Sequence, residues 1–189
     1  MAERISQSVI AQRITRDAAD YPSVLRARLG ENAPVELTVL GEPGLLRLRR
    51  TALFCSARTP GDAILRTHDA ARRMRDDSIT VISGFHSPIE KECLRILLRG
   101  KQPIIVCPAR AIETMRIPSE CGLAFDDGRM LFLSPFTQGP VRITKLSATR
   151  RNSVVTALAD AAYVAHGMPG GQTEKTVELL RNWGVPAPF

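Results

Sequence analysis

The chain has 189 residues, of which 44% are apolar, so it can bury the core of one α/β domain with a short N-terminal appendage. Its net charge of +7 and pI of about 9.8 favour a polyanionic partner such as a nucleic acid or a nucleotide, although charge alone fixes no function. Aromatic residues make up only 5% of the chain, which argues against a single-strand channel lined with stacking rings.

The first predicted elements are two short helices within residues 1–30, separated at Pro22. A strand is expected at Val35–Leu40 and a second short strand at Leu45–Arg50. We expect residues 1–50 to form an extension packed on the edge of a sheet.

The main sheet is expected to begin with a strand at Ala52–Cys55. In the turn that follows, Thr59 is the predicted N-cap of a helix, Pro60 its first residue and Asp62 the acidic residue three positions after the cap. The arginines of that helix are most simply a solvated face, and a nucleic-acid stripe is the alternative.

Residues 79–108 form the best-specified unit, a strand, a tight turn, a helix and a second strand. The two apolar runs are typical of buried parallel strands, and Ser83-Gly84 breaks the chain after the first. Ser87 and Glu90 have the spacing of a capping box, with Pro88 at the first helical position. Such a turn at the carboxyl end of a parallel strand directs backbone N–H groups toward an anion.

A strand is then expected at Met130–Leu133, followed by a long loop over Ser134–Ser147. Arg150 and Arg151 are placed at the start of the next helix, where their charge opposes the helix dipole. This conflict predicts an anion or a carboxylate beside them, and two solvated arginines are the alternative.

The last predicted strand, Ala161–Ala165, is followed by the Gly-rich turn His166–Gln172 and a helix at Thr173–Asn182. An edge strand is expected at Val185–Phe189, after Gly184 has ended the helix. Trp183 is expected to pack this helix on the sheet, with base stacking as the alternative.

The alternation of strands and helices predicts an α/β fold of the Rossmann-like type, a mostly parallel sheet with helices on both faces and a short N-terminal extension, with residues 51–189 as the main domain. Three strand-to-helix turns then lie on one sheet edge, where backbone N–H groups and arginines would hold a phosphate. The candidate nucleic-acid or phosphate site comprises Arg58, Thr59, Ser83, Gly84, His86, Ser87, Arg150, Arg151, Asn152, Gly170, Gly171, Gln172 and Thr173.

Four cysteines, Cys55, Cys93, Cys107 and Cys121, form no CxxC pair. Their spacing favours buried, reduced thiols in a cytoplasm over a zinc site, which needs close ligand pairs. We predict no metal and no other cofactor. No apolar run has transmembrane length and the N-terminus lacks a signal-peptide core, so a cytoplasmic protein without a membrane partner is expected.

The order of these features resembles the DNA-processing protein A family (DprA, also called Smf). Tyr21-Pro22 resembles its entry pattern, Ser56-Ala57-Arg58 its GxR turn, Ser83-Gly84 with Ile89 its SGxAxGID motif and Arg150-Arg151-Asn152 its RRN motif. Glu90 stands where the family has Asp. The resemblance implies a Rossmann-like homodimer that binds single-stranded DNA in a basic pocket and helps to load a recombinase during DNA uptake.

Two other functions stay open, and no catalytic residue is assigned. Pro169-Gly170-Gly171 with Thr173 partly resembles the PGGxGTxxE signature of Lonely Guy phosphoribohydrolases, which implies cleavage of a nucleoside monophosphate glycosidic bond. In that reading Glu174 or Glu178 would replace the catalytic glutamate. The third reading is a non-catalytic sensor of small nucleotides.

Overall fold

The computed structural model describes residues 10–56, 59–137, 143–165 and 172–187. Its strands are β1 (Gln12–Thr15), β2 (Glu36–Gly41), β3 (Arg50–Phe54), β4 (Thr80–Ser83), β5 (Ile104–Val106), β6 (Met130–Ser134) and β7 (Ala161–Val164). Its α-helices are α1 (Ser23–Leu29), α2 (Gly61–Asp76), α3 (Pro88–Leu98), α4 (Gly122–Asp126), α5 (Lys145–Leu158) and α6 (Gln172–Asn182). Short 3₁₀ helices occupy Gly30–Asn32, Pro43–Arg47 and Ser119–Cys121.

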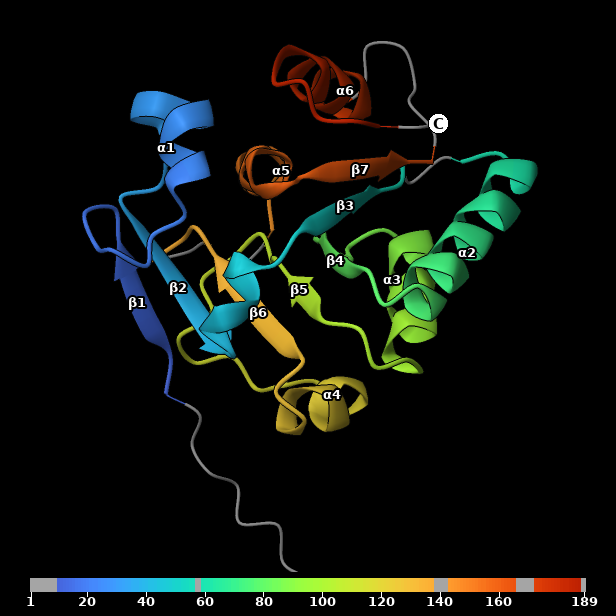
Figure 1. Ribbon diagram of the computed structural model, residues 1–189, viewed down its shortest axis with the longest axis horizontal. Helices are drawn as coiled ribbons and strands as arrows, with labels where there is room; N and C mark the ends of the chain where they lie inside the picture. Colours follow the sequence, from blue (N-terminus) through green and yellow to red (C-terminus); the bar gives the residue numbers. More distant parts are fainter. Residues whose placement is uncertain (1–9, 57–58, 138–142, 166–171, 188–189) are drawn as a thin grey trace, which may run out of the picture.

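The strands form one sheet in the order β1-β2-β6-β5-β4-β3-β7 (Figure 1). The run from β6 to β7 is parallel throughout, whereas β2 pairs antiparallel with β6 and β1 antiparallel with β2. The predicted α/β class and mostly parallel sheet are therefore confirmed. The division of the chain into two parts at residue 50 stays a prediction. In the structure, β1 and β2 belong to the same sheet as β3.

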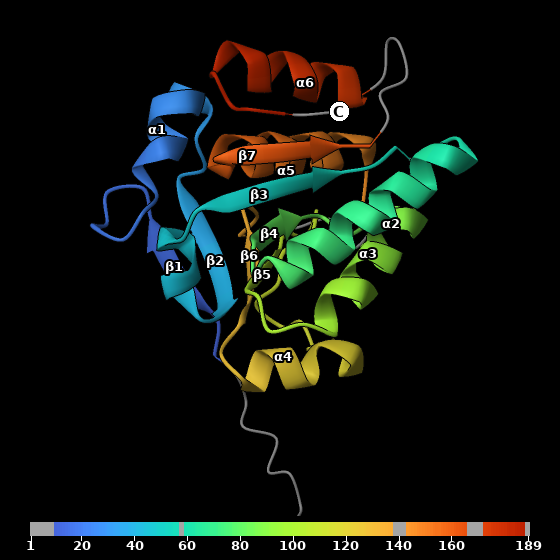
Figure 2. The same cartoon turned by 45° about the vertical axis from the view of Figure 1, so that its right-hand side comes forward.

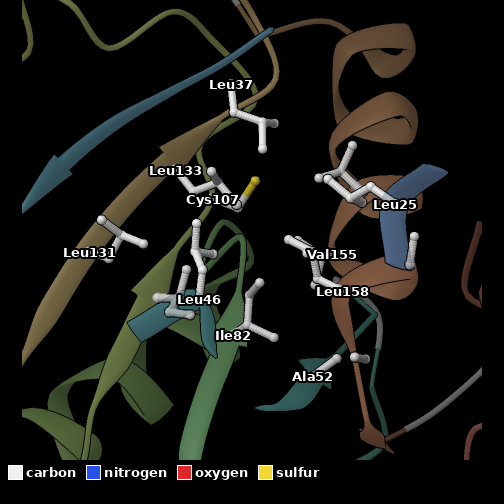
Figure 3. Packing of buried hydrophobic residues seen from close by; sticks show 14 of the residues in the cluster. Leu25, Leu37, Leu46, Ala52, Ile82, Cys107, Leu131, Leu133, Val155 and Leu158 are labelled. Atoms are coloured by element: carbon white, nitrogen blue, oxygen red, sulfur yellow. The ribbon is translucent and has the colours of Figure 1, made fainter. Parts of the chain in front are cut away.

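Helices cover both faces of the sheet (Figures 1 and 2). On one face α1, α5 and α6 contribute to a buried apolar cluster, and on the other α2, α3 and α4 contribute to a second one. Figure 3 shows Leu25 of α1 and Val155 and Leu158 of α5 directed toward Leu37 and Ile82 of the sheet. Burial of this apolar surface is the main term that stabilises the layers.

The start of α3 follows the sequence prediction closely. Ser87 has extended backbone angles, and its Oγ accepts a hydrogen bond from the Glu90 amide at 3.2 Å. The Glu90 carboxylate accepts one from the Ser87 amide at 3.1 Å, which completes the capping box. The predicted helix start at Pro88 is confirmed.

Three predicted elements and one predicted helix cap are wrong. Residues 12–15 form a strand because they pair antiparallel with β2, with the buried Ile14 opposite Leu37. Residues 45–47 lie in a 3₁₀ helix, where the adjacent Leu45 and Leu46 are both buried. Residues 185–187 form no strand, although the Pro186 carbonyl accepts a hydrogen bond from the Ala162 amide at 2.8 Å.

The fourth error concerns the helix after β3. Its N-cap is Pro60, without a side-chain capping bond, and the helix begins at Gly61. The Thr59 hydroxyl donates to the Ser56 carbonyl at 2.8 Å, and Thr59 stands one position before the N-cap of α2.

Candidate nucleic-acid interface

The strand order creates a topological switch between β3 and β7. The connection that leaves β3 leads to α2 on one face of the sheet, and the connection that leaves β7 leads to α6 on the opposite face. Ligands of open α/β sheets bind in the crevice outside the carboxyl ends of such strands. Arg58, Gly170 and Gly171 belong to these two connections and lie outside the described residues.

The described candidates at this switch are Thr59, Gln172 and Thr173. Thr59 is partly buried, and its Oγ1 also lies 3.4 Å from the Cys55 Sγ. Gln172 and Thr173 form the start of α6, whose first turn also contains Glu174. Because β3, β4 and β7 are adjacent and parallel, all three predicted turns follow strand ends on one edge, as the sequence indicated.

The turn after β4 is held from within the molecule. Ser83 is fully buried, and its hydroxyl donates to the Leu53 carbonyl at 2.7 Å and accepts from the Phe85 amide at 3.3 Å. Phe85 is buried with a φ of 45°, an uncommon conformation for a bulky residue. In contrast, the His86 side chain is exposed. Ser83 and Ser87 thus shape this turn, and His86 is the side chain it presents to solvent.

The expectation of open backbone N–H groups is wrong for His86 and Ser87. Both amides donate to Oε2 of Glu90, at 2.8 and 3.1 Å, and the Cys55 amide donates to Oε1 at 3.1 Å. Glu90 is 7% exposed. The anion that this turn holds is therefore a carboxylate of the chain itself.

Arg151 lies directly behind the same turn. It is 5% exposed, and its Nη1 donates to the Cys107 carbonyl at 3.0 Å. A Cβ on Gly84 would stand 1.2 Å from that Nη1, so only glycine leaves room for the guanidinium. Among the described residues, the Nε of Arg151 has no hydrogen-bond partner. Arg151 thus supports the turn and places a positive charge beneath it.

Arg150 and Arg151 do not lie at the start of their helix. Thr144 caps α5 with a capping box to Ser147, so both arginines lie in the second turn, and the predicted conflict with the helix dipole is wrong. Arg150 is exposed, with its guanidinium carbon 5.7 Å from the Phe136 ring centroid. Asn152 is partly buried, and its carbonyl accepts from the Thr156 hydroxyl.

Arg150 lines a second region of the carboxyl edge, an open cleft of about 430 Å³ beside β6 and β2. Its other lining residues are Arg13, Val35, Glu36, Pro135 and Thr137. Sequence reasoning missed this cleft because it placed Arg13 in a helix. Arg13 lies 3.5 Å from Glu36 and 3.9 Å from Glu113, so the cleft carries both signs of charge.

Charge is distributed unevenly between the two edges of the parallel strands. The five connections that leave these strands contain Arg58, Arg110, Arg116 and Arg142 against Glu113. Of the helices that follow, α5 has Lys145, Arg150 and Arg151 in its first two turns, whereas the first turns of α2, α3 and α6 contain Asp62, Glu90 and Glu174. The connections that enter the strands contain Arg47, Arg49, Arg99, Lys101 and Arg129 against Glu42, Asp77, Asp127 and Asp160. The connections at the carboxyl edge therefore have a net excess of three basic residues (four against one), whereas those at the opposite edge have an excess of one (five against four). Arg110 and Arg116, both exposed, were absent from the predicted site.

Within the described ranges, no three His, Cys, Asp or Glu residues are grouped so that they could hold a metal ion. No described helix is both long and apolar enough to cross a membrane. The four cysteines are free and buried, as predicted. Trp183 is partly buried against the α5 and α6 side of the core, which confirms its predicted packing role.

Comparison with known proteins gives a consistent assignment. The structure is similar to DNA processing protein A from Streptococcus pneumoniae (TM-score 0.75, 18% identity), covering 96% of this chain and 62% of that chain. It is also similar to DNA processing protein A from Helicobacter pylori (TM-score 0.73, 15% identity), covering 95% of this chain and 80% of that chain. The latter structure concerns that protein's single-stranded DNA binding mode.

The chain thus spans less than two thirds of the Streptococcus pneumoniae protein, and no curated protein sequence matches it. At the level of sequence, the family model described as DNA recombination-mediator protein A matches residues 12–181, which is most of the chain. The chain belongs to the DNA recombination-mediator protein A family.

Proposed function

We propose that the chain binds single-stranded DNA along the carboxyl edge of its parallel strands, chiefly through the DNA phosphates. The observation that carries this proposal is the excess of arginine and lysine at this edge, beside a nearly balanced opposite edge. Contacts with phosphates supply most of the sequence-independent affinity of nucleic-acid-binding proteins. The family assignment and the single-stranded DNA ligand of the Helicobacter pylori relative support the same partner.

The predicted site residues divide into two groups in this proposal. Residues that are exposed or lie at the edge contact the DNA strand directly. They are Arg58, Thr59, His86, Arg150, Gly170, Gly171, Gln172 and Thr173, together with Arg110 and Arg116. Ser83, Gly84, Ser87, Arg151 and Asn152 hold the edge in shape, because their described side chains or backbones are buried or partly buried. Phosphate contacts come mainly from side chains, since Glu90 occupies the His86 and Ser87 amides.

Fluorescence anisotropy with a labelled oligonucleotide tests this function. We expect Arg150→Ala to weaken binding, because its exposed guanidinium lies on the basic edge. Arg49→Ala is the matched control, since Arg49 is also exposed and lines a cleft at the opposite edge. Each lost phosphate contact should lower the slope of log K against log salt by roughly 0.7.

Equal losses in the two variants, or no binding by the wild type at low salt, would refute the proposal. A duplex of the same sequence is the comparison that tests preference for a single strand. Binding that does not depend on salt would show that phosphates are not the main contact.

The family assignment, rather than the described geometry, supports the finer features of this proposal. We infer a role in recombination during DNA uptake, a homodimer in the cytoplasm and contact with a recombinase. Light scattering coupled to size-exclusion chromatography measures the dimer, and a pull-down with a bacterial recombinase measures that contact.

The hydrolase and sensor readings have no specific support in the described residues. Glu174 and Glu178 lie on the exposed side of α6. Chromatography of a nucleoside monophosphate after overnight incubation would detect released base. A thermal-shift screen of nucleotides separates a sensor from a DNA-binding protein.

A further inference from the structure

Glu90 joins two elements that are far apart in the sequence. Its Oε2 accepts the His86 and Ser87 amides just before α3, and its Oε1 accepts the Cys55 amide just after β3. A capping box explains only the bond between Glu90 and the Ser87 amide. The bonds to His86 and Cys55 are additional, so the side chain does more than begin a helix.

The carboxylate lies at the N-terminus of α3, where negative charge is favoured, and these three amides surround it. Glu90 is 7% exposed, and a buried charge is tolerated only when hydrogen bonds replace its water. Both oxygens have donors here. The carboxylate therefore fills a position in which other α/β proteins hold a phosphate of the ligand.

Cys55 directly follows β3 and begins the connection that contains Arg58 and Thr59. The Thr59 hydroxyl lies 3.4 Å from the Cys55 Sγ, so Thr59 contacts the residue whose amide Glu90 holds. Glu90 thus determines where the connection leaves β3 relative to the turn after β4. Both segments border the proposed DNA-binding edge.

We propose that Glu90 is an internal anion and a positioning residue for DNA binding. It occupies the anion position of the Ser83–Ser87 turn, excludes a DNA phosphate from the His86 and Ser87 amides, and holds Cys55, the first residue after β3, beside that turn. The effect on DNA rests on the proposed function, whereas the internal anion itself does not.

Chemical rescue tests this assignment. Glu90→Ala removes a CH₂–COO⁻ group, which acetate matches in shape and charge. We expect the variant to lose roughly 5–10 °C in Tm, because three buried donors lose their acceptor. We also expect roughly tenfold weaker binding of the labelled oligonucleotide, which corresponds to about 1.4 kcal/mol. Sodium acetate should restore both quantities, and sodium chloride at equal ionic strength should restore neither.

Two further variants keep the test decisive. Glu90→Gln fills the same space with a single acceptor oxygen, so it should bind the oligonucleotide less tightly than wild type and show no response to acetate. Glu92→Ala, on the same helix but with a half-exposed side chain, should be insensitive to acetate.

The internal anion is refuted if acetate stabilises wild type, Glu90→Gln and Glu90→Ala equally. The positioning role is refuted if both Glu90 variants bind DNA as tightly as wild type. If wild type does not bind DNA while acetate still rescues the Tm of Glu90→Ala, the proposed function fails and the internal anion stands.

Discussion

Gly84→Ala is the substitution whose effect the structure defines most sharply. The new Cβ would lie 1.2 Å from Nη1, 2.0 Å from Cζ and 2.6 Å from Nη2 of Arg151. The guanidinium would have to move by about 2 Å to restore ordinary packing in a close-packed interior. It cannot do so freely, because Arg151 is 5% exposed and donates to the Cys107 carbonyl.

Two costs combine in this variant. Loss of a hydrogen bond from a charged donor to a buried carbonyl costs about 1.5–3 kcal/mol. Overpacking of a filled site costs about 1–3 kcal/mol. We therefore expect Gly84→Ala to lower the free energy of unfolding by roughly 3–5 kcal/mol. For a chain of this size that corresponds to a fall in Tm of roughly 6–20 °C.

Urea unfolding followed by circular dichroism measures the loss. Gly122→Ala is the matched control, since a Cβ there meets nothing within 4 Å and its φ of −54° suits alanine. In the double variant Gly84→Ala/Arg151→Ala the clash is absent, so its destabilisation should be smaller than the sum of the single effects. Additive effects, or a Gly84→Ala variant as stable as the control, would refute the packing of Arg151 behind the turn.

Further predictions concern caps and buried thiols. Arg28→Ala should lower the free energy of unfolding by about 1.5–3 kcal/mol in urea titrations, because the Arg28 Nη1 donates to the Ala157 and Ala159 carbonyls at the end of α5. Ser87→Ala should cost about 1 kcal/mol through loss of the α3 cap, and Ser87→Asn should recover part of it. Burial raises the pKa of the Cys93 and Cys107 thiols to about 12, so a thiol-reactive disulfide should modify them at pH 8 only after unfolding. Between pH 9.0 and about 12 these thiols lose their protons in the unfolded chain but keep them in the folded protein. The stability that the raised pKa values contribute is therefore complete below pH 9.0 and should be lost as the pH rises from 9.0 to about 12. Cys107→Ala should reduce the slope of stability against pH in that interval, and an unchanged slope would contradict the assignment.

Local signals explain why part of the fold was predictable. Ser87, Pro88 and Glu90 specify the start of α3 within four residues, and the structure confirms it. The apolar runs before Ser83 and before Pro108 are buried on both faces of the sheet, so their composition was informative. Four-residue β1 carries one buried side chain among polar ones, and that pattern is too short to distinguish a strand from a helix.

The site was less predictable because it depends on contacts across the sequence. The bond between Glu90 and the Cys55 amide spans 35 residues, and nothing near Glu90 in the sequence indicates it. Thr144 and Ser147 begin α5 earlier than expected, and Ser147 lacks the acidic side chain that marks most capping boxes. Once the helix is placed, its turn of about 100° per residue separates the neighbours Arg150 and Arg151. One faces the solvent and the other lies beneath Gly84.

Photo-crosslinking to a single-stranded oligonucleotide that carries a photoreactive base tests the central claim most directly. Mass spectrometry of the crosslinked peptides reports which edge of the parallel strands the DNA follows. We predict crosslinks in residues 107–118, 135–151 and 165–173, which leave the carboxyl ends of the parallel strands. Crosslinks concentrated in residues 42–49, 99–103 and 127–129, at the opposite edge, would contradict the account.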